Sequence, residues 1–294
     1  MTGWFDERSG LRGTVALITG GAGGLGEAIA RDLAANGVRT AVIDIDAAAV
    51  AALTRSFAEG GHDLIAHHGD ARDPEALEAL FTAADARWGR LDTLVNVVGG
   101  TFRAPFTETT PKGWDALLRT NLLHVLHACS LAADRMRAGG RGGSIINLTT
   151  IEAHRAAPGY AVYAAAKAAV EQFARTLAVE LAPDGVRVNN IAPDYTPTPN
   201  LTRLSRGANA LDTPAGARAA IPMGRTGRLT DISNCAVFLA SALSSYVTGG
   251  TLHPDGGTHA SAGWLNWPDS GWSNHIPASV LALLDREGTA DPRA

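Results

Sequence analysis

The sequence predicts an α/β protein with one doubly wound, seven-stranded parallel sheet and helices on both of its faces. Strand-like apolar runs alternate with helical segments along the chain, which is the pattern of repeated βαβ units. The runs are almost continuously apolar, as in parallel strands that helices cover on both sides. The chain has 294 residues, of which 46% are hydrophobic, so it can bury a large core. No low-complexity linker divides it into two domains.

The first half of the chain supplies four of the predicted strands. The first strand ends at a glycine-rich turn, and a segment with helical spacing follows it. Pro74 stands at the first position of a predicted helix, where proline is favoured. The predicted strands are 14–19, 39–45, 63–68 and 91–98, and the predicted helices are 27–36, 47–57 and 74–88.

The second half continues the alternation, with two interruptions. Its predicted strands are 144–149, 186–192 and 247–253, and its predicted helices are 111–137, 159–181 and 230–243. Residues 193–228 are rich in Pro, Gly, Thr and Arg and are predicted to form a lid over a site. Residues 258–294 contain three tryptophans close together, and an exposed aromatic cluster is costly. We therefore expect a domain over 1–257 and a C-terminal extension over 258–294 that packs on the site or on a subunit interface.

Charge and composition exclude several classes of function. The net charge is -4 with acids and bases interspersed, so neither nucleic acid nor a membrane is expected as a partner. The N-terminal residues lack the charged-then-apolar order of a secretory signal, and no apolar run is long enough to span a bilayer. Cys129 and Cys235 are far apart and suggest neither a disulfide nor a zinc site. We expect a cytoplasmic protein without a metal.

The glycine-rich turn predicts a nucleotide site. Gly20, Gly24 and Gly26 allow a sharp turn and a close approach to a ligand. The helix that starts near Leu25 would direct its free N–H groups at a pyrophosphate. The spacing differs from the general G-x-G-x-x-G fingerprint, and a chance cluster of glycines is the alternative. The position between the first strand and the first helix favours the nucleotide site.

Asp44 favours NAD over NADP as the cofactor. It lies 18 residues beyond Gly26 at the end of the second strand, where a carboxylate accepts hydrogen bonds from the adenosine ribose hydroxyls. The same carboxylate would repel a 2'-phosphate, and no Arg or Lys between Gly20 and Gly26 or directly after Asp44 would neutralise one. Asp46, in contrast, is predicted to cap the following helix.

A tyrosine and a lysine form the candidate acid/base pair. The chain has 25 basic residues, of which only Lys112 and Lys167 are lysines. Tyr163 and Lys167 are four residues apart on a predicted helix, so both project from one face. A lysine beside a tyrosine stabilises the phenolate and lowers its pKa, which suits acid/base catalysis near neutral pH. A solvated helix face is the alternative, but residues 161–170 are otherwise almost entirely apolar.

These motifs resemble those of the short-chain dehydrogenase/reductase family, in its short, non-extended branch. The resemblance covers about residues 11–257. Its motifs are 19–26, Gly69-Asp70, 96–99, Thr120-Asn121, 145–150, 163–167, 186–189, 193–198 and 255–257.

The resemblance implies a Rossmann-like domain and a set of catalytic roles. Tyr163 would be the general acid/base, and Lys167 would hold the nicotinamide ribose hydroxyls and tune Tyr163. Asn121 would position a water in a proton relay, although a helix-interior asparagine bonded to the backbone is the alternative. Thr150 stands where the family usually has a catalytic serine and would hold the substrate oxygen. Its methyl group restricts rotation, but its hydroxyl can still donate and accept.

The resemblance also implies a cofactor track. Asp70 would contact adenine, 96–99 would pass beside the adenosine ribose, and Thr196 with Thr198 would hold the carboxamide. Glu152 and His154 would border the substrate, with a solvated loop as the alternative. The implied cofactor-binding residues are Gly20, Gly24, Leu25, Gly26, Asp44, Ile45, Asp70, Ala71, Asn96, Val97, Gly99, Tyr163, Lys167, Pro193, Thr196 and Thr198.

Two further positions depart from the family pattern. Val97 replaces one of the usual asparagines near the cofactor. Asp194 replaces the usual glycine after Pro193, and we expect it to tolerate a positive φ there.

The expected function is NAD-dependent hydride transfer between a secondary alcohol and its ketone, in a dimer or tetramer of identical chains. A steroid, an acyl thioester, a cyclic diol and a polyol are all candidate substrates. A non-catalytic, NAD-sensing protein of the same fold is the alternative. Thr150 and the changed asparagine motif are its only support, and the presence of Tyr163, Lys167 and Asn121 argues against it. A nucleotide-sugar epimerase of the extended branch would need a different glycine spacing and a longer C-terminal domain.

Overall fold

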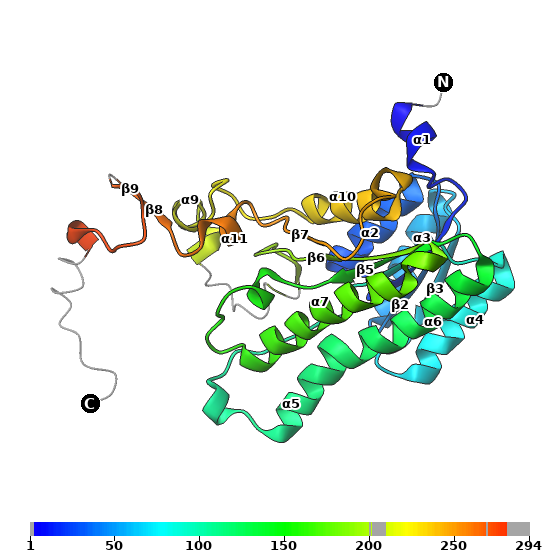
Figure 1. Cartoon of the computed structure of the whole chain (residues 1–294), viewed down its shortest axis with the longest axis horizontal. Coiled ribbons are helices and arrows are strands. Elements are labelled where there is room, and N and C mark those ends of the chain that lie inside the picture. Colours follow the sequence, from blue (N-terminus) through cyan, green and yellow to red (C-terminus); the bar gives the residue numbers. More distant parts are fainter. Residues whose placement is uncertain (1–2, 200, 202–209, 269, 281–294) are drawn as a thin grey trace.

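The computed structural model describes residues 3–199, 201, 210–268 and 270–280, and its centre is a seven-stranded parallel sheet (Figure 1). The strand order is β3-β2-β1-β4-β5-β6-β7, which confirms the predicted doubly wound sheet. The order reverses between β1 and β4, and ligands bind doubly wound sheets at such a switch point. The strands are β1 Val15–Thr19, β2 Arg39–Asp44, β3 Leu64–His68, β4 Thr93–Asn96, β5 Gly143–Leu148, β6 Val186–Ile191 and β7 Thr251–Leu252.

Helices cover both faces of this sheet (Figure 1). On one face lie α2 (Gly24–Ala35), α3 (Ala47–Glu59) and α10 (Leu229–Ala240), and on the other lie α4 (Pro74–Trp88), α6 (His124–Gly139) and α7 (Ala161–Leu181). Side chains alternate between the faces along a strand, so Val15 and Leu17 pack with α4, α6 and α7. Ala16 and Ile18 pack with α2, α3 and α10. Both faces of β1 are therefore apolar, which explains its uninterrupted hydrophobic run.

Side-chain caps fix the starts of several helices. The carboxylate of Asp46 accepts hydrogen bonds from the main-chain N–H groups of Ala48 and Ala49, which confirms its predicted capping role for α3. Asp73 caps α4 through the N–H of Glu75, and Pro74 occupies the first helical turn as predicted.

The predicted helix over 111–137 is wrong in one respect. It divides into α5 (Pro111–Leu118) and α6, which are joined by a π-helical turn at Arg119–Leu123 that contains Asn121. Such turns insert one extra residue into a helix and are frequent at functional sites. The predicted strand over 247–253 is also shorter than expected, because Gly249 has a φ of +73° and ends a turn before β7.

The lid and the C-terminal extension pack against each other. The lid contains a single-turn 3-10 helix at Ala210–Asp212 and α9 (Pro214–Ala220), while residues 202–209 lie outside the described residues. The extension contains α11 (Thr258–Ser261) and an antiparallel hairpin of β8 (Leu265–Trp267) and β9 (Gly271–Ser273). The hairpin lies beside α9 and away from the sheet (Figure 1). Residues 281–294 of the extension are outside the described residues.

A short helix, α1 (Trp4–Ser9), precedes β1 and was not predicted. No helix in the described ranges combines the length and the hydropathy that a membrane crossing requires.

Candidate active site

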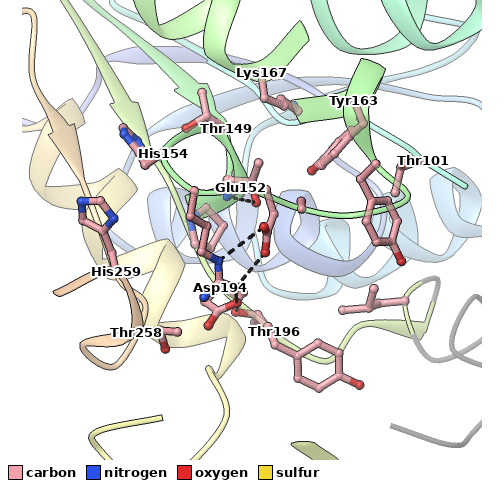
Figure 2. Close-up of a pocket in the computed structure, with 18 of the residues that line it drawn as sticks. Thr101, Thr149, Glu152, His154, Tyr163, Lys167, Asp194, Thr196, Thr258 and His259 are labelled. Atoms are coloured by element: carbon pink, nitrogen blue, oxygen red, sulfur yellow. Dashed lines mark hydrogen bonds and ion pairs between the residues drawn. The ribbon is translucent and has the colours of Figure 1, made fainter. Parts of the chain in front are cut away.

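A cavity of about 1010 Å³ lies at the carboxyl ends of β4, β5 and β6 (Figure 2). Its wall comes from the segments that follow these strands, from the start of α7, from the lid and from the beginning of the C-terminal extension. This is the edge at which open α/β sheets bind ligands, and the cavity is large enough for a small molecule.

The structure gathers about half of the predicted site residues around this cavity. Those that line it are Leu25, Val97, Gly99, Thr150, Glu152, His154, Tyr163, Lys167, Pro193, Thr196 and Thr198. Those that do not are Gly20, Gly24, Gly26, Asp44, Ile45, Asp70, Ala71, Asn96 and Asn121.

Tyr163 projects from α7 and lies half-buried in the cavity wall (Figure 2), where its side chain forms a hydrogen bond with Thr150. Burial raises the pKa of Tyr163 to about 12, and the charge of Glu152 adds to this effect, whereas the hydrogen bond with Thr150 opposes it. The sequence predicted a pKa lowered by Lys167, and the direction in the structure is the opposite one. The reason is physical: desolvation of the phenolate outweighs the other influences, and Tyr163 is held as a neutral phenol.

Lys167 is almost completely buried, with 3% of its surface exposed. Its Nζ donates a hydrogen bond to the main-chain oxygen of Leu148 at 2.8 Å. Burial lowers the pKa of Lys167 to about 8. Gly99 lies close by: a Cβ at this position would be 3.2 Å from Nζ of Lys167 and 3.2 Å from Oδ1 of Asn121. A glycine at position 99 therefore lets the loop after β4 approach the lysine.

Asn121 holds that same loop from the π-helical turn. Its Oδ1 accepts a hydrogen bond from the N–H of Gly100 at 3.1 Å, and its Nδ2 donates to the oxygens of Gly100 at 2.8 Å and Leu117 at 2.9 Å. Both N–H groups of the amide are thus occupied by the main chain. The side chain acts as a clamp between the turn and the loop and does not line the cavity.

Asn96 also turns its side chain away from the cavity, into a row of polar side chains that crosses the sheet. Its Nδ2 donates to Oδ1 of Asn147 at 2.9 Å, and Nδ2 of Asn147 donates to Oδ1 of Asn190 at 3.3 Å. Nδ2 of Asn190 then donates to Oγ1 of Thr251 at 3.2 Å. These four residues, the amide row, are register partners on β4, β5, β6 and β7.

The glycine turn has the geometry that its sequence predicted. Gly20 and Gly24 have positive φ values of +69° and +52°. A Cβ on Gly26 would lie 1.9 Å from the main-chain oxygen of Gly20, so only glycine fits there. Gly24 also lies beside Thr198 of the cavity wall, since a Cβ at this position would be 3.4 Å from Cγ2 of Thr198. The turn and the cavity are therefore adjacent.

Asp44 and Asp70 lie on the same edge of the sheet but differ in their partners. Oδ2 of Asp44 accepts a hydrogen bond from the N–H of Ala22 in the glycine turn at 3.0 Å, which fixes the carboxylate beside the turn. Asp70 forms a two-oxygen ion pair with Arg72, at 2.6 Å from Nη2, and this partner lowers the pKa of Asp70.

Sequence reasoning missed a buried carboxylate beneath the cavity. Glu171 accepts hydrogen bonds from Oγ1 of Thr149 at 2.8 Å and faces Nε2 of His154 at 3.0 Å. One signal was available, because Glu171 lies four residues after Lys167 on α7 and therefore shares its helix face.

Residues that line the cavity next to Glu152 were missed as well. Arg155 pairs with Glu152 at 2.8 Å and with Asp194 at 3.5 Å. Burial raises the pKa of Asp194. The expectation of a positive φ at Asp194 is wrong, because Ala262 alone among the described non-glycine residues has one. His253 lies next to both His154 and His259. Burial lowers the pKa of His253, and the charges of His154 and His259 add to this effect.

Comparison with known proteins covers most of the chain. Residues 20–259 match the family model described as enoyl-(acyl carrier protein) reductase. The chain is 38% identical to D-threitol dehydrogenase of Mycolicibacterium smegmatis, over 86% of this chain and 95% of that protein. It is 35% identical to 3beta-hydroxysteroid dehydrogenase 1 of Eggerthella lenta, over 84% of this chain and 94% of that one.

A solved structure agrees with these matches. A gluconate 5-dehydrogenase from Burkholderia cenocepacia, in complex with NADP and tartrate, superposes with a TM-score of 0.76 at 34% identity. The match covers 85% of this chain and 96% of that one. The similar proteins are dehydrogenases named for chemically different substrates.

Proposed function

The chain belongs to the short-chain dehydrogenase/reductase family, and from this premise we propose that it catalyses NAD-dependent hydride transfer between a secondary alcohol and its ketone. One observation carries the proposal: Thr150, Tyr163 and Lys167 line a single cavity at the switch-point edge of the sheet. A hydroxyl, a phenol and a buried ammonium are the groups that polarise an alcohol oxygen and move its proton.

The residues present fit a dinucleotide. The glycine turn leaves room where a Cβ would collide with the backbone, and the N-terminus of α2 supplies free N–H groups beside it. The nicotinamide ring would supply the hydride acceptor or donor. We assign Lys167 to the ribose hydroxyls, and Thr196 and Thr198 of the cavity wall to the carboxamide.

Proton transfer at the substrate oxygen is assigned to Tyr163. In ketone reduction the phenol donates its proton to the carbonyl oxygen, while Thr150 donates a hydrogen bond to the same oxygen. The pKa of about 12 keeps Tyr163 protonated and ready for this direction. In alcohol oxidation the phenolate accepts the hydroxyl proton, so a proton must first leave Tyr163. We propose that Lys167 carries it. The predicted role of Asn121 in positioning a water is not part of this proposal, because its amide is bonded to the main chain of Gly100 and Leu117.

Asp44 supports NAD as the preferred cofactor. Its carboxylate is fixed beside the glycine turn, where it would accept hydrogen bonds from ribose hydroxyls and repel a 2'-phosphate. The gluconate 5-dehydrogenase structure holds NADP, so the preference of this chain needs a direct comparison of both cofactors.

We also propose that the protein acts as a homo-oligomer. Leu118 and Leu123 are exposed at the junction of α5 and α6, and Val179 is exposed on α7. Large apolar side chains on adjacent helices favour burial against a second copy. Sedimentation equilibrium would measure the assembly, and a monomer at micromolar concentration would contradict it.

The function is tested by a screen for NAD reduction over polyols, hydroxysteroids, cyclic diols and hydroxyacyl thioesters, with NADP in parallel. We expect turnover of at least one class, and we expect Tyr163→Phe to lower kcat by about 10²–10⁴-fold with little change in NAD affinity. Tyr246→Phe is the matched control because Tyr246 is fully exposed. Full activity of Tyr163→Phe would overturn the mechanism. NAD binding without turnover of any class would instead favour the NAD-sensing alternative.

A further inference from the structure

Three histidines from three separate segments meet at one side of the cavity. His154 follows β5, His253 directly follows β7, and His259 lies in α11. Their ring centroids are 4.7 Å apart for His154 and His253, 5.1 Å for His154 and His259, and 4.6 Å for His253 and His259. One ring nitrogen from each lies within 4.8 Å of the other two. Figure 2 shows His154 and His259 on the same side of the cavity, away from Tyr163.

The hydrogen bonds of His154 fix which of its nitrogens is free. Nε2 lies 3.0 Å from the carboxylate of Glu171, which is a buried acceptor and also receives the hydroxyl of Thr149. A carboxylate only accepts, so Nε2 carries the hydrogen and Nδ1 of the neutral ring keeps its lone pair. A histidine whose second nitrogen donates to a carboxylate is the usual arrangement behind a metal ligand.

His253 supplies a second, independent observation. Its Nε2 is buried and has no hydrogen-bond partner among the described residues. A buried polar atom left without a partner costs free energy, so such an atom calls for an explanation. A metal ion bound by this nitrogen would provide one.

From this geometry we propose that His154, His253 and His259 bind a divalent transition metal such as Zn²⁺. Three protein ligands with one open position is the arrangement of zinc sites that also bind water or substrate. Because His154 and His259 line the cavity, the open position faces it and would accept an oxygen atom. Bond lengths of about 2.0–2.1 Å require the three nitrogens to move closer together. His259 has the freedom to do so, since its side chain is exposed.

No sequence motif marks this site, because the ligands converge only in the folded chain. The positions of the two cysteines do not indicate it, and the proposal stands against the expectation of a protein without a metal. The site is also distinct from the candidate hydride-transfer residues, since none of the three histidines belongs to the pair on α7.

The test measures metal content and needs neither cofactor nor alcohol, so its failure is separate from a failure of the proposed function. The full chain is stripped with a chelator and titrated with ZnCl₂ by calorimetry, and bound zinc is counted by elemental analysis. We expect one Zn²⁺ per chain. With Co²⁺ as a spectroscopic probe we expect the visible absorption of a four- or five-coordinate ion.

Variants identify the ligands. His154→Gln, His253→Gln and His259→Gln should each weaken zinc binding by at least about 100-fold, and Glu171→Gln by about 10-fold or more. His275→Gln is the matched control, because His275 lies in the C-terminal extension, as His259 does, but outside the cluster. This variant should bind zinc as tightly as the parent does. Thermal unfolding of each metal-free variant shows whether it is folded. Absence of stoichiometric zinc binding, or unchanged binding by folded His253→Gln and His259→Gln, would overturn the proposal.

Discussion

Lys167 places its ammonium group 2.8 Å from the main-chain oxygen of Leu148, at the end of the central strand β5. The carbonyl is a weak partner for a buried charge, because it brings no negative charge of its own. The protein therefore maintains a charged group in the core at a cost to its stability. That cost depends on pH.

The first prediction concerns this cost. Burial lowers the pKa of Lys167 from 10.5 in the unfolded chain to about 8 in the folded one. The unfolded state then binds more protons between pH 8 and 10.5, so the contribution of Lys167 to stability rises through this window and is lost as the pH falls through 8. Relative to Lys167→Met, the free energy of unfolding of the parent should gain on the order of 2 kcal/mol from pH 8 to 10.

Urea unfolding at several pH values measures this difference. Lys112→Met is the control, because Lys112 is the other lysine of the chain and is exposed. Tyr163 stays protonated in this range, since its pKa is about 12. A parent-to-variant difference that stays flat or falls with pH would show that Lys167 is not a buried charged group.

The second prediction separates the hydroxyl of Thr150 from its methyl group. Thr150→Val keeps the shape but removes the hydrogen bond to Tyr163 and to the substrate oxygen, so kcat should fall by about 10²-fold or more. Thr150→Ser should stay within a few-fold of the parent, because it keeps the hydroxyl. Thr101→Val serves as the control in steady-state assays, since Thr101 also lines the cavity and its hydroxyl bonds to the main chain of Phe102. Equal activities of Thr150→Val and Thr150→Ser would exclude a role for the hydroxyl.

The third prediction concerns cofactor choice. Asp44→Ala removes the carboxylate beside the glycine turn, and the affinity for NAD should fall by about 10-fold through lost hydrogen bonds to a charged group. The affinity for NADP should rise or stay constant, because the repulsion of a 2'-phosphate disappears. Titration by fluorescence measures both constants. Asp46→Asn is the control, and an unchanged ratio of NAD to NADP affinity in Asp44→Ala would refute the assignment.

The fourth prediction tests the C-terminal extension with two truncations. Thr258, His259, Ala262 and Gly263 line the cavity, whereas the hairpin that follows packs beside α9. Removal of 258–294 should raise KM by about 10-fold or more with a smaller change in kcat, because a wall of the substrate cavity is lost. Removal of 264–294 keeps that wall and should have a smaller effect. If removal of 258–294 leaves the kinetics and the assembly of the parent unchanged, the extension has no part in the site.

Much of the fold was readable from local patterns. The strands were marked by continuous apolar runs, and α4 was predicted to the residue because Pro74 fixes its start. The π-helical turn at Asn121 was not predicted, because the hydrophobic pattern of 111–137 continues through it. The amide of Asn121 binds Gly100, which lies 21 residues earlier in the chain, and a local hydrophobic pattern does not encode such a contact.

The candidate site was predictable where one segment carries the residues, and less so where packing decides. Tyr163 and Lys167 share a helix face, and the structure places both at the cavity. The direction of the pKa shift of Tyr163 depends on its burial, which no spacing reveals. The cluster of His154, His253 and His259 depends on three segments meeting, so the sequence held no signal for it.

The amide row has a consequence for how the chain finds its alignment. A strand that is apolar on both faces has no alternation of polar and apolar residues to mark its alignment with its neighbours. A slide of one residue at β5 would turn Asn147 to the opposite face of the sheet and break the hydrogen bonds that it makes with Asn96 and Asn190. The row thus penalises misaligned sheets more than it strengthens the correct one. The row therefore favours one alignment of β4, β5, β6 and β7, the strands at whose carboxyl ends the cavity lies.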